Sequence, residues 1–371
     1  MADEFSFGIE EEYFLVDART HEISADAPDA FFQAVRKACG DQVAREFLRS
    51  QVEVITAPHI DIAAARAELR HLRRIVSEIA ATYGLAILAA GTHPTASWRE
   101  QQQTESERYD AVMADLQMIG QRDMLCGLHV HVELPDPDER IDVMYRVLPY
   151  LPLFVALGAS SPFWQSRRTG LMGYRLAAYD ELPRTGIPEL FRTTAEYDAY
   201  VAALVHAGVV PDASYIWWTI RPSLKHPTLE LRAPDSCTRL DDTIAIAALY
   251  RTLVHHLALH PFENWELDAV GRAVIVENKW RAQRYGVHGT FATGTGAVKV
   301  IDMIEEIIAT TAESARELGC EDGVQRCRDI AINGTSADEQ LRRYNAKRQA
   351  GGSREDALAA VTQWLATETI R

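Results

Sequence analysis

The sequence predicts an α+β protein in which helices cover one face of a mixed or antiparallel sheet. Short apolar or alternating segments, typical of strands, are interspersed with helical periodicity over roughly the first two thirds of the 371 residues. The remaining third has the pattern of helices almost throughout. No internal repeat and no linker rich in Pro, Gly or Ser divides the chain. We therefore expect a single domain over residues 1–371, with a mostly helical part from about residue 241.

In the first half of the chain, alternation predicts strands and a spacing of three or four residues predicts helices. The clearest helix is 62–83, where Ile62, Leu69 and Val76 recur on one face. The predicted strands are 5–16, 47–55, 85–90 and 125–134, and the predicted helices are 29–39, 62–83, 108–124 and 141–158, the last interrupted by prolines.

The second half contains fewer strands. Segments 215–221 and 228–233 are predicted strands on either side of a Pro-containing turn. A segment rich in Gly and Thr, 289–296, could be taken for a phosphate-binding loop, but it lacks the Gly-Lys-Ser/Thr ending, so we expect a turn or hairpin tip. The predicted helices are 194–207, 241–260, 268–284, 298–318 and 336–370.

The composition is that of a soluble globular protein and disfavours two classes of partner. The chain is 47% hydrophobic and 25% charged, and its formal net charge is −15. Nucleic acids and anionic membranes attract basic surfaces, so neither is expected as the main partner. An anionic small molecule remains compatible with this charge, because a local arginine cluster or bound cations can reverse the field inside a cleft.

Several features favour a cytoplasmic location. The N-terminal segment lacks the basic and apolar regions of a signal peptide, and no apolar run approaches the roughly 18 residues that span a bilayer. The five cysteines contain no Cys-x-x-Cys pair, which fits a reducing compartment. Cys320 and Cys327 are therefore expected to be core thiols rather than a disulfide.

Acidic residues gather on the predicted N-terminal strand. Side chains in a strand alternate between its two faces, so Glu10 and Glu12 project together, whereas Glu11 shares the other face with apolar residues. Two neighbouring carboxylates among apolar residues are costly unless a cation lies between them. The alternative is an exposed edge strand. Glu11 is assigned no chemistry.

Three further predicted strands show the same division into a polar and an apolar face. Glu53, the pair His129 and His131, and the pair Glu230 and Arg232 lie on the polar faces. The simplest arrangement of these strands is one sheet. Its apolar face packs on helices, and its polar face forms a concave cation site. Carboxylates with few nitrogen ligands suit Mg²⁺ or Mn²⁺ better than zinc.

Basic residues add a second element to this site. Hard cations together with Arg221, Arg232 and the group Lys279, Arg281 and Arg284 describe a site for a nucleoside polyphosphate and for phosphoryl transfer. Neither a Walker A motif nor a dinucleotide fingerprint is present, so ATP would have to be held in another way. A solvated charge run on a helix is the alternative for the last three residues.

A series of short motifs runs in order from about residue 5 to residue 286. They are GIEEEYFLVD at 8–17, QVE at 51–53, GTHP at 91–94, ERY at 107–109, GLHVHV at 127–132, IRPS at 220–223, TLELR at 228–232 and RYG at 284–286. In this order they resemble the type 2 glutamate–cysteine ligases, also called carboxylate–amine ligases. That family is similar to glutamine synthetase in fold and metal chemistry.

The resemblance implies a glutamine-synthetase-like catalytic fold, in which an antiparallel sheet curves into a funnel with helices on its outer face. Two or three Mg²⁺ ions would lie at its waist. Glu12 and Glu53 would bind one of them. Glu10, His129 and Glu230 would bind the ion nearer the nucleotide phosphates.

The resemblance also implies roles for the remaining polar residues. His131 would face the nucleotide, and Arg221 and Arg232 would hold phosphate or the transferring phosphoryl group, so that with Glu53 they are the catalytic candidates. Further candidates are Lys279, Arg281 and Arg284 for nucleotide contacts and Glu46 as an additional metal ligand.

The implied reaction has two steps. ATP phosphorylates a carboxylate, typically the γ-carboxylate of glutamate, and an amine then displaces phosphate from the acyl phosphate. The simplest substrates are glutamate and cysteine, giving γ-glutamylcysteine, ADP and phosphate. Three alternatives stay open: the same chemistry on another amine or acid, a catalytically silent binding homologue, and a metallohydrolase. The sequence identifies no general base. Apolar helices and family precedent favour a homodimer.

Overall fold

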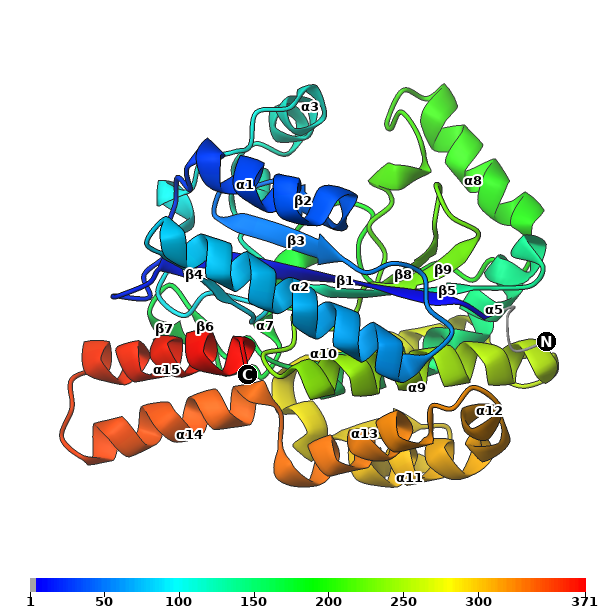
Figure 1. Cartoon of the computed structure of the whole chain (residues 1–371). Coiled ribbons are helices and arrows are strands. Elements are labelled where there is room, and N and C mark those ends of the chain that lie inside the picture. Colours follow the sequence, from blue (N-terminus) through cyan, green and yellow to red (C-terminus); the bar gives the residue numbers. More distant parts are fainter. Residues whose placement is uncertain (1–4) are drawn as a thin grey trace.

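The computed structural model describes residues 5–371 and places an antiparallel sheet at the centre of the molecule (Figure 1). The sheet has seven strands in the order β2-β3-β1-β5-β9-β8, and β4 also pairs with β1. The predicted α+β class with an antiparallel sheet is confirmed. The strands of this sheet are β1 (Phe7–Asp17), β2 (Val43–Arg45), β3 (Gln51–Ile55), β4 (Leu85–Leu88), β5 (Leu128–Glu133), β8 (Ile220–Pro222) and β9 (Thr228–Leu231).

β1, with 11 residues, organises this sheet. One of its edges pairs with β3, from Glu10 to Phe14. The opposite edge is divided, because β5 pairs with residues 7–11 and β4 pairs with residues 14–17. The polar side chains near the middle of β1 therefore lie where β4 and β5 diverge.

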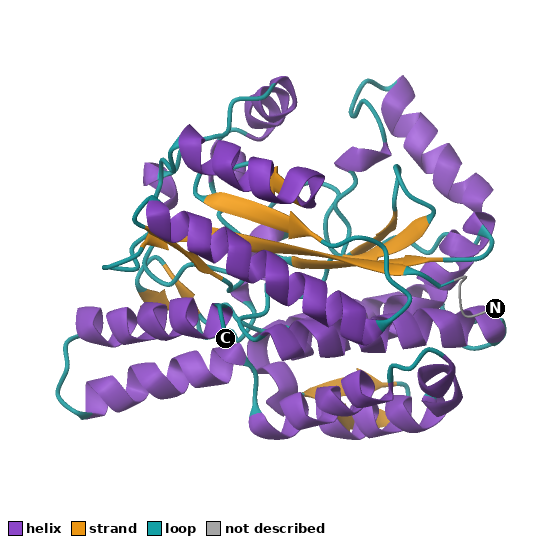
Figure 2. Ribbon diagram, in the orientation of Figure 1, coloured by secondary structure: helices purple, strands orange, loops and turns teal. Residues whose placement is uncertain are grey.

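Helices cover the apolar face of the sheet in two layers. α2 contacts β1, β3 and β4, α9 contacts β5, and α13 packs on the outer side of α9. Figure 2 shows α3 and α8 standing apart at the top, on the side away from α9. The helices of the first two thirds are α1 (Asp29–Cys39), α2 (Ile62–Thr82), α3 (Glu107–Leu116), α4 (Met118–Gln121), α5 (Arg140–Val147), α6 (Leu151–Leu157), α7 (Tyr174–Tyr179) and α8 (Thr194–His206).

The C-terminal part, residues 241–371, is mostly helical and contains one hairpin. β10 (Thr290–Thr293) and β11 (Gly296–Lys299) pair where the Gly- and Thr-rich segment predicts a hairpin tip. A further small hairpin, formed by β6 (Phe163–Trp164) and β7 (Arg167–Arg168), lies earlier in the chain. The helices here are α9 (Leu240–Leu259), α10 (Ala269–Tyr285), α11 (Val300–Thr310), α12 (Ala312–Glu317), α13 (Glu321–Asn333), α14 (Ser336–Gln349) and α15 (Arg354–Thr369).

Several predicted elements have different limits in the structure. The strand predicted over 47–55 begins only at Gln51, and the strand predicted over 215–221 is reduced to β8. The helix predicted over 108–124 breaks at Gln117, whose φ of 52° is left-handed. The helix predicted over 336–370 is two helices, because Gly351 has a φ of 84° and ends the first of them. β2, α7 and α13 were not predicted.

Two further predictions concern the cysteines and membrane-spanning segments. The cysteines are free thiols, and Cys320 and Cys327 are buried as predicted. Among residues 5–371, no helix combines the length and the apolar character needed to cross a bilayer.

A buried ion pair joins the sheet to the helices behind it. Glu11 is 0% exposed and Arg73 of α2 is 2% exposed. The Arg73 Nε and Nη2 atoms donate to the two carboxylate oxygens of Glu11 at 2.8 and 2.6 Å. The hydroxyls of Tyr13 and Thr243 donate to the same carboxylate. Glu11 therefore has a structural role on the apolar face of β1, with every oxygen paired.

Arg73→Ala should lower the free energy of unfolding by about 3–5 kcal/mol, because it leaves the Glu11 charge buried without its cation. The midpoint of urea-induced unfolding measures this loss. Arg74→Ala is the matched control, since Arg74 is 66% exposed and lies 3.7 Å from an equally exposed Glu78. That change should cost less than about 1 kcal/mol. Equal losses would mean that the buried pair does not hold the sheet to α2.

Candidate active site

The strand register places the predicted metal ligands next to one another. Glu12 of β1 lies opposite Glu53 of β3. Glu10, two residues earlier on the same face, lies opposite His129 of β5. His131 lies opposite Glu230 of β9 in the following pair of strands. Residues far apart in the sequence therefore share the polar face of one sheet.

Five side chains form two groups with the geometry of metal sites. One group is Glu10, His129 and Glu230, and the other is Glu12, Glu53 and His129. Within each group the candidate ligand atoms all lie within 4.8 Å of one another. These five are the residues that the sequence predicts as metal ligands.

The hydrogen bonding of the two histidines suits a bound cation. The Nε2 atom of His129 is buried and has no hydrogen-bond partner within residues 5–371. His129 Nδ1 lies 3.2 Å from one carboxylate oxygen of Glu10, and His131 Nε2 lies 3.2 Å from the other. An unpaired buried nitrogen such as His129 Nε2 is costly, and a divalent cation would satisfy it. The donor set of carboxylates and imidazole thus fits Mg²⁺ or Mn²⁺.

At two carboxylates of the site, burial and neighbouring acids outweigh the opposing charge of Arg232. Burial, followed by the charges of Glu10, Glu46 and Glu12, raises the pKa of Glu53 well above its usual range. Burial and then the charge of Glu12 raise the pKa of Glu46 in the same way. A cation between these groups would favour their ionised forms, because an opposite charge offsets both burial and mutual repulsion.

Other carboxylates of the site are already neutralised by nitrogen groups. Burial acts to raise the pKa of Glu230, but Arg232 and Arg221 outweigh it and hold that pKa far below its usual range. Arg221 Nε donates to Glu230 at 2.7 Å, and Arg232 donates to the other carboxylate oxygen. Hydrogen bonds from His129 and His131 similarly outweigh burial and hold the pKa of Glu10 well below its usual range.

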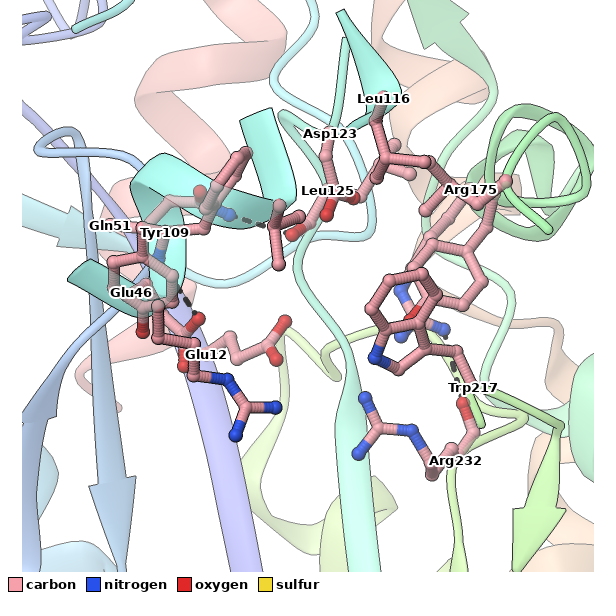
Figure 3. A pocket seen from close by; sticks show the side chains of 15 residues that line it. Glu12, Glu46, Gln51, Tyr109, Leu116, Asp123, Leu125, Arg175, Trp217 and Arg232 are labelled. Atoms are coloured by element: carbon pink, nitrogen blue, oxygen red, sulfur yellow. Dashed lines mark hydrogen bonds between the residues drawn. The ribbon is translucent and has the colours of Figure 1, made fainter. Parts of the chain in front are cut away.

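A pocket opens beside the Glu12 end of this cluster (Figure 3). Its wall includes Arg232 and Glu12 from the predicted site, so the pocket and the candidate metal site are continuous. Acidic, basic and aromatic side chains all contribute to the lining. The further charged or aromatic residues are Glu46, Phe47, Arg108, Tyr109, Asp123, Arg175, Tyr179 and Trp217.

Arg175 of α7 reaches this pocket through a close approach to Gly127. Its Nη1 atom donates to the carbonyls of Arg232 and Pro234, each at 3.2 Å. A Cβ atom on Gly127 would lie 2.2 Å from Nη2 of Arg175 and 3.1 Å from Nε2 of His129. A side chain at position 127 would therefore have to displace the Arg175 guanidinium from the space it occupies beside His129.

The structure brings most, but not all, of the predicted site residues together. Lys279 Nζ is paired with the Asp180 carboxylate at 2.7 Å, and the Arg284 guanidinium lies 5.0 Å from the Tyr285 ring centre. Neither residue lines the pocket or belongs to the two ligand groups. Their predicted contact with a nucleotide gains no support from these positions.

Arg175 and Asp123 were not singled out from the sequence. Arg175 lies on a helix of only six residues, and Asp123 lies in an irregular segment before β5. Arg175 lies outside every predicted element, and Asp123 lies in the part of the predicted helix 108–124 that is irregular in the structure. Arg108 and Tyr109 belong to a motif noted in the sequence, but its place in the pocket depends on how α3 folds over the sheet.

Comparison of the sequence with known families gives one match over nearly the whole chain. The model of glutamate-cysteine ligase family 2 matches residues 6–362. A relative from Bradyrhizobium sp. (strain ORS 278) is 57% identical over 371 residues, which cover 99% of this chain and 88% of the relative. A relative from Rhodospirillum rubrum is 44% identical over 372 residues, covering 99% and 96%. Both names assign these proteins provisionally as glutamate–cysteine ligase 2.

Two solved structures share the fold. Glutamate–cysteine ligase from Francisella tularensis, in complex with AMP, has a TM-score of 0.68 at 15% identity and covers 99% of this chain and 90% of its own. A bifunctional glutathione synthetase from Pasteurella multocida has a TM-score of 0.71 at 18% identity. The match covers 99% of this chain and 53% of the Pasteurella chain, so this chain spans about half of it. These likenesses show that this chain has the fold of the two structures, in agreement with the predicted α+β fold.

The two ligand groups predict two binding sites for Mn²⁺, measurable by calorimetric titration. Glu12→Gln should weaken one site at least about tenfold, because it removes a ligand charge. The amide oxygen can still accept the hydrogen bond that Gly127 now donates to Glu12. Glu133→Gln is the matched control, since Glu133 is on β5 two residues beyond His131 but accepts from Ser6 at 2.6 Å and belongs to neither group. Equal weakening by both changes would contradict the assignment.

Proposed function

Because the chain belongs to glutamate-cysteine ligase family 2, we propose that it is an ATP-dependent carboxylate–amine ligase. The proposed substrates are glutamate and cysteine, and the products are γ-glutamylcysteine, ADP and phosphate. The observation that carries the proposal is the meeting of two carboxylate–histidine groups with Arg221 and Arg232 on one sheet face. Such a combination suits the transfer of a phosphoryl group to a carboxylate.

In this proposal the two ligand groups together hold ATP and the acid through bound cations. Glu12 and Glu53 would hold one cation, and Glu10, His129 and Glu230 the other. Bound Mg²⁺ or Mn²⁺ supplies charge neutralisation at the γ-phosphoryl oxygens. In this proposal His131 faces the nucleotide, and Glu12 lies on the side of the pocket, so ATP and the amino acids approach the site from different sides.

The two arginines would stabilise charge on the transferring group. Both guanidinium groups are held by Glu230, and Arg232 also lies on the wall of the pocket. A guanidinium at that position is preorganised for an anion that forms between ATP and the acid. In this proposal Arg232 therefore contacts the acyl phosphate, and Arg221 supports the phosphate side.

The pocket has the charges that an amino acid requires. Arg108 and Arg175 can pair with a carboxylate, while Asp123 and Glu46 can pair with an ammonium group. These residues lie outside the strands that carry the metal ligands. The same phosphoryl-transfer chemistry could therefore serve another amine or acid if these side chains favoured it.

A screen for ADP release tests the proposed reaction. Mg-ATP and glutamate are combined with a panel of amines that includes cysteine, and the products are identified by mass spectrometry. ADP and γ-glutamylcysteine should form only when both glutamate and cysteine are present. ADP release with a different amine would identify another ligase. Release without any acid or amine, or no turnover under any condition, would contradict the proposal.

Arg232→Ala should lower kcat by about 100-fold or more while changing the KM for ATP much less, because the guanidinium is assigned to charge that develops during transfer. Steady-state kinetics with varied ATP separates the two parameters. Arg342→Ala is the control, because Arg342 is 66% exposed on α14 and, among residues 5–371, its ion pair is with Glu339. A proportional loss of kcat and of ATP affinity would place Arg232 in nucleotide binding instead.

A further inference from the structure

Asp123 occupies a firmly held position on the pocket that contains Glu12 (Figure 3). Its backbone N–H donates to the carbonyl of Gly120 at 3.1 Å. The next residue, Met124, is fully buried, and the carbonyl of Leu125 accepts a 2.6 Å hydrogen bond from Gln51 Nε2. The short segment between α4 and β5 thus fixes the backbone of Asp123 relative to the sheet.

The Asp123 carboxylate differs from the other acids of this pocket in having no partner. Within residues 5–371, neither a hydrogen bond nor an ion pair engages it, and only longer-range charges act on it. Glu12 accepts a hydrogen bond from Gly127, and Glu46 accepts one from the backbone of Phe47. Asp123 is therefore free to pair with a group of the substrate.

Charged groups of both signs face Asp123 from the elements around it. Burial and then the charge of Glu12 raise its pKa to about 7, against the opposing effect of Arg175 and Arg232. Glu46 and Tyr179 are the other titratable neighbours. A cation held by Glu12 would weaken the main repulsion and lower this pKa, so the carboxylate would be ionised at neutral pH in the loaded site.

We propose that Asp123 is the general base that accepts a proton from the ammonium group of the incoming amine. This assignment rests on the proposed ligase function. The carboxylate is unpaired, lies on the same pocket as Glu12 and Arg232, and can form an ion pair with an ammonium group before the proton moves.

Amide formation needs no reactant other than the amine and the acyl phosphate. Asp123 takes one proton from the ammonium group, and the freed nitrogen lone pair attacks the carbonyl carbon of the acyl phosphate. The C–N bond forms, the bond between carbon and the phosphate oxygen breaks, and the departing phosphate takes the second nitrogen proton. Asp123 then returns its proton to solvent.

Other groups on the pocket are less suited to this role. Arg108, Arg175 and Arg232 cannot accept a proton. Burial raises the pKa of Tyr109 and of Tyr179, which keeps both phenols protonated. Glu12 is assigned to a cation, and a carboxylate that binds a metal is a weaker base.

Hydroxylamine separates this role from a structural one, since it is largely uncharged at neutral pH and attacks acyl phosphates without losing a proton first. Asp123→Asn should lower amide formation with cysteine by about 100-fold or more. It should retain most glutamate-dependent hydroxamate formation with hydroxylamine. Raising the pH should partly restore its reaction with cysteine, because more of the amine is then unprotonated.

Asp115→Asn is the matched control, because Asp115 lies on the exposed part of α3 and makes the same chemical change away from the pocket. It should behave like the unaltered protein with both nucleophiles. Equal loss of both reactions in Asp123→Asn, or no loss of either, would overturn the assignment of Asp123. Absence of ADP and hydroxamate from the unaltered protein would instead contradict the proposed function.

Discussion

The separation of three consecutive glutamates onto two faces of β1 is the constraint on which the site depends. Glu11 points into the apolar layer, where Arg73 neutralises it. Glu10 and Glu12 consequently point to the opposite face, where the ligand groups form. If β1 shifted by one residue relative to its neighbouring strands, its two faces would be exchanged. Glu10 and Glu12 would then be buried against helices, and Glu11 would be separated from Arg73. The ion pair on one face therefore fixes the register that builds the other.

Strand alternation is the part of this architecture that the sequence predicts best. It indicated that Glu10, Glu12, Glu53, His129 and Glu230 face the same way, and the structure places them together. Alternation does not reveal partners across the fold, so it could not pair Glu11 with a helix residue 62 positions later. It also does not apply to irregular segments or short helices, where the pocket obtains its remaining charged residues.

The site divides its carboxylates into two electrostatic classes. Nitrogen groups of this chain hold the pKa of Glu10 and of Glu230 below their usual ranges. Burial and mutual repulsion raise the pKa of Glu46 and of Glu53. The unbalanced negative charge thus lies toward the pocket, where a hard cation would gain most from binding. The net charge of −15 does not report this local arrangement.

The acceptors of Arg73 have a consequence for how the protein is made. Besides Glu11, its guanidinium donates to the carbonyls of Cys237, Thr238 and Thr369. A chain emerging from the ribosome presents Glu11 and Arg73 early, but the last of these acceptors appears only some 296 residues after Arg73. The core behind the site is therefore completed only once the chain has been made as far as Thr369. A chain that lacks Thr369 would leave one N–H of the buried Arg73 guanidinium without this acceptor, although Glu11 would still pair with the charge.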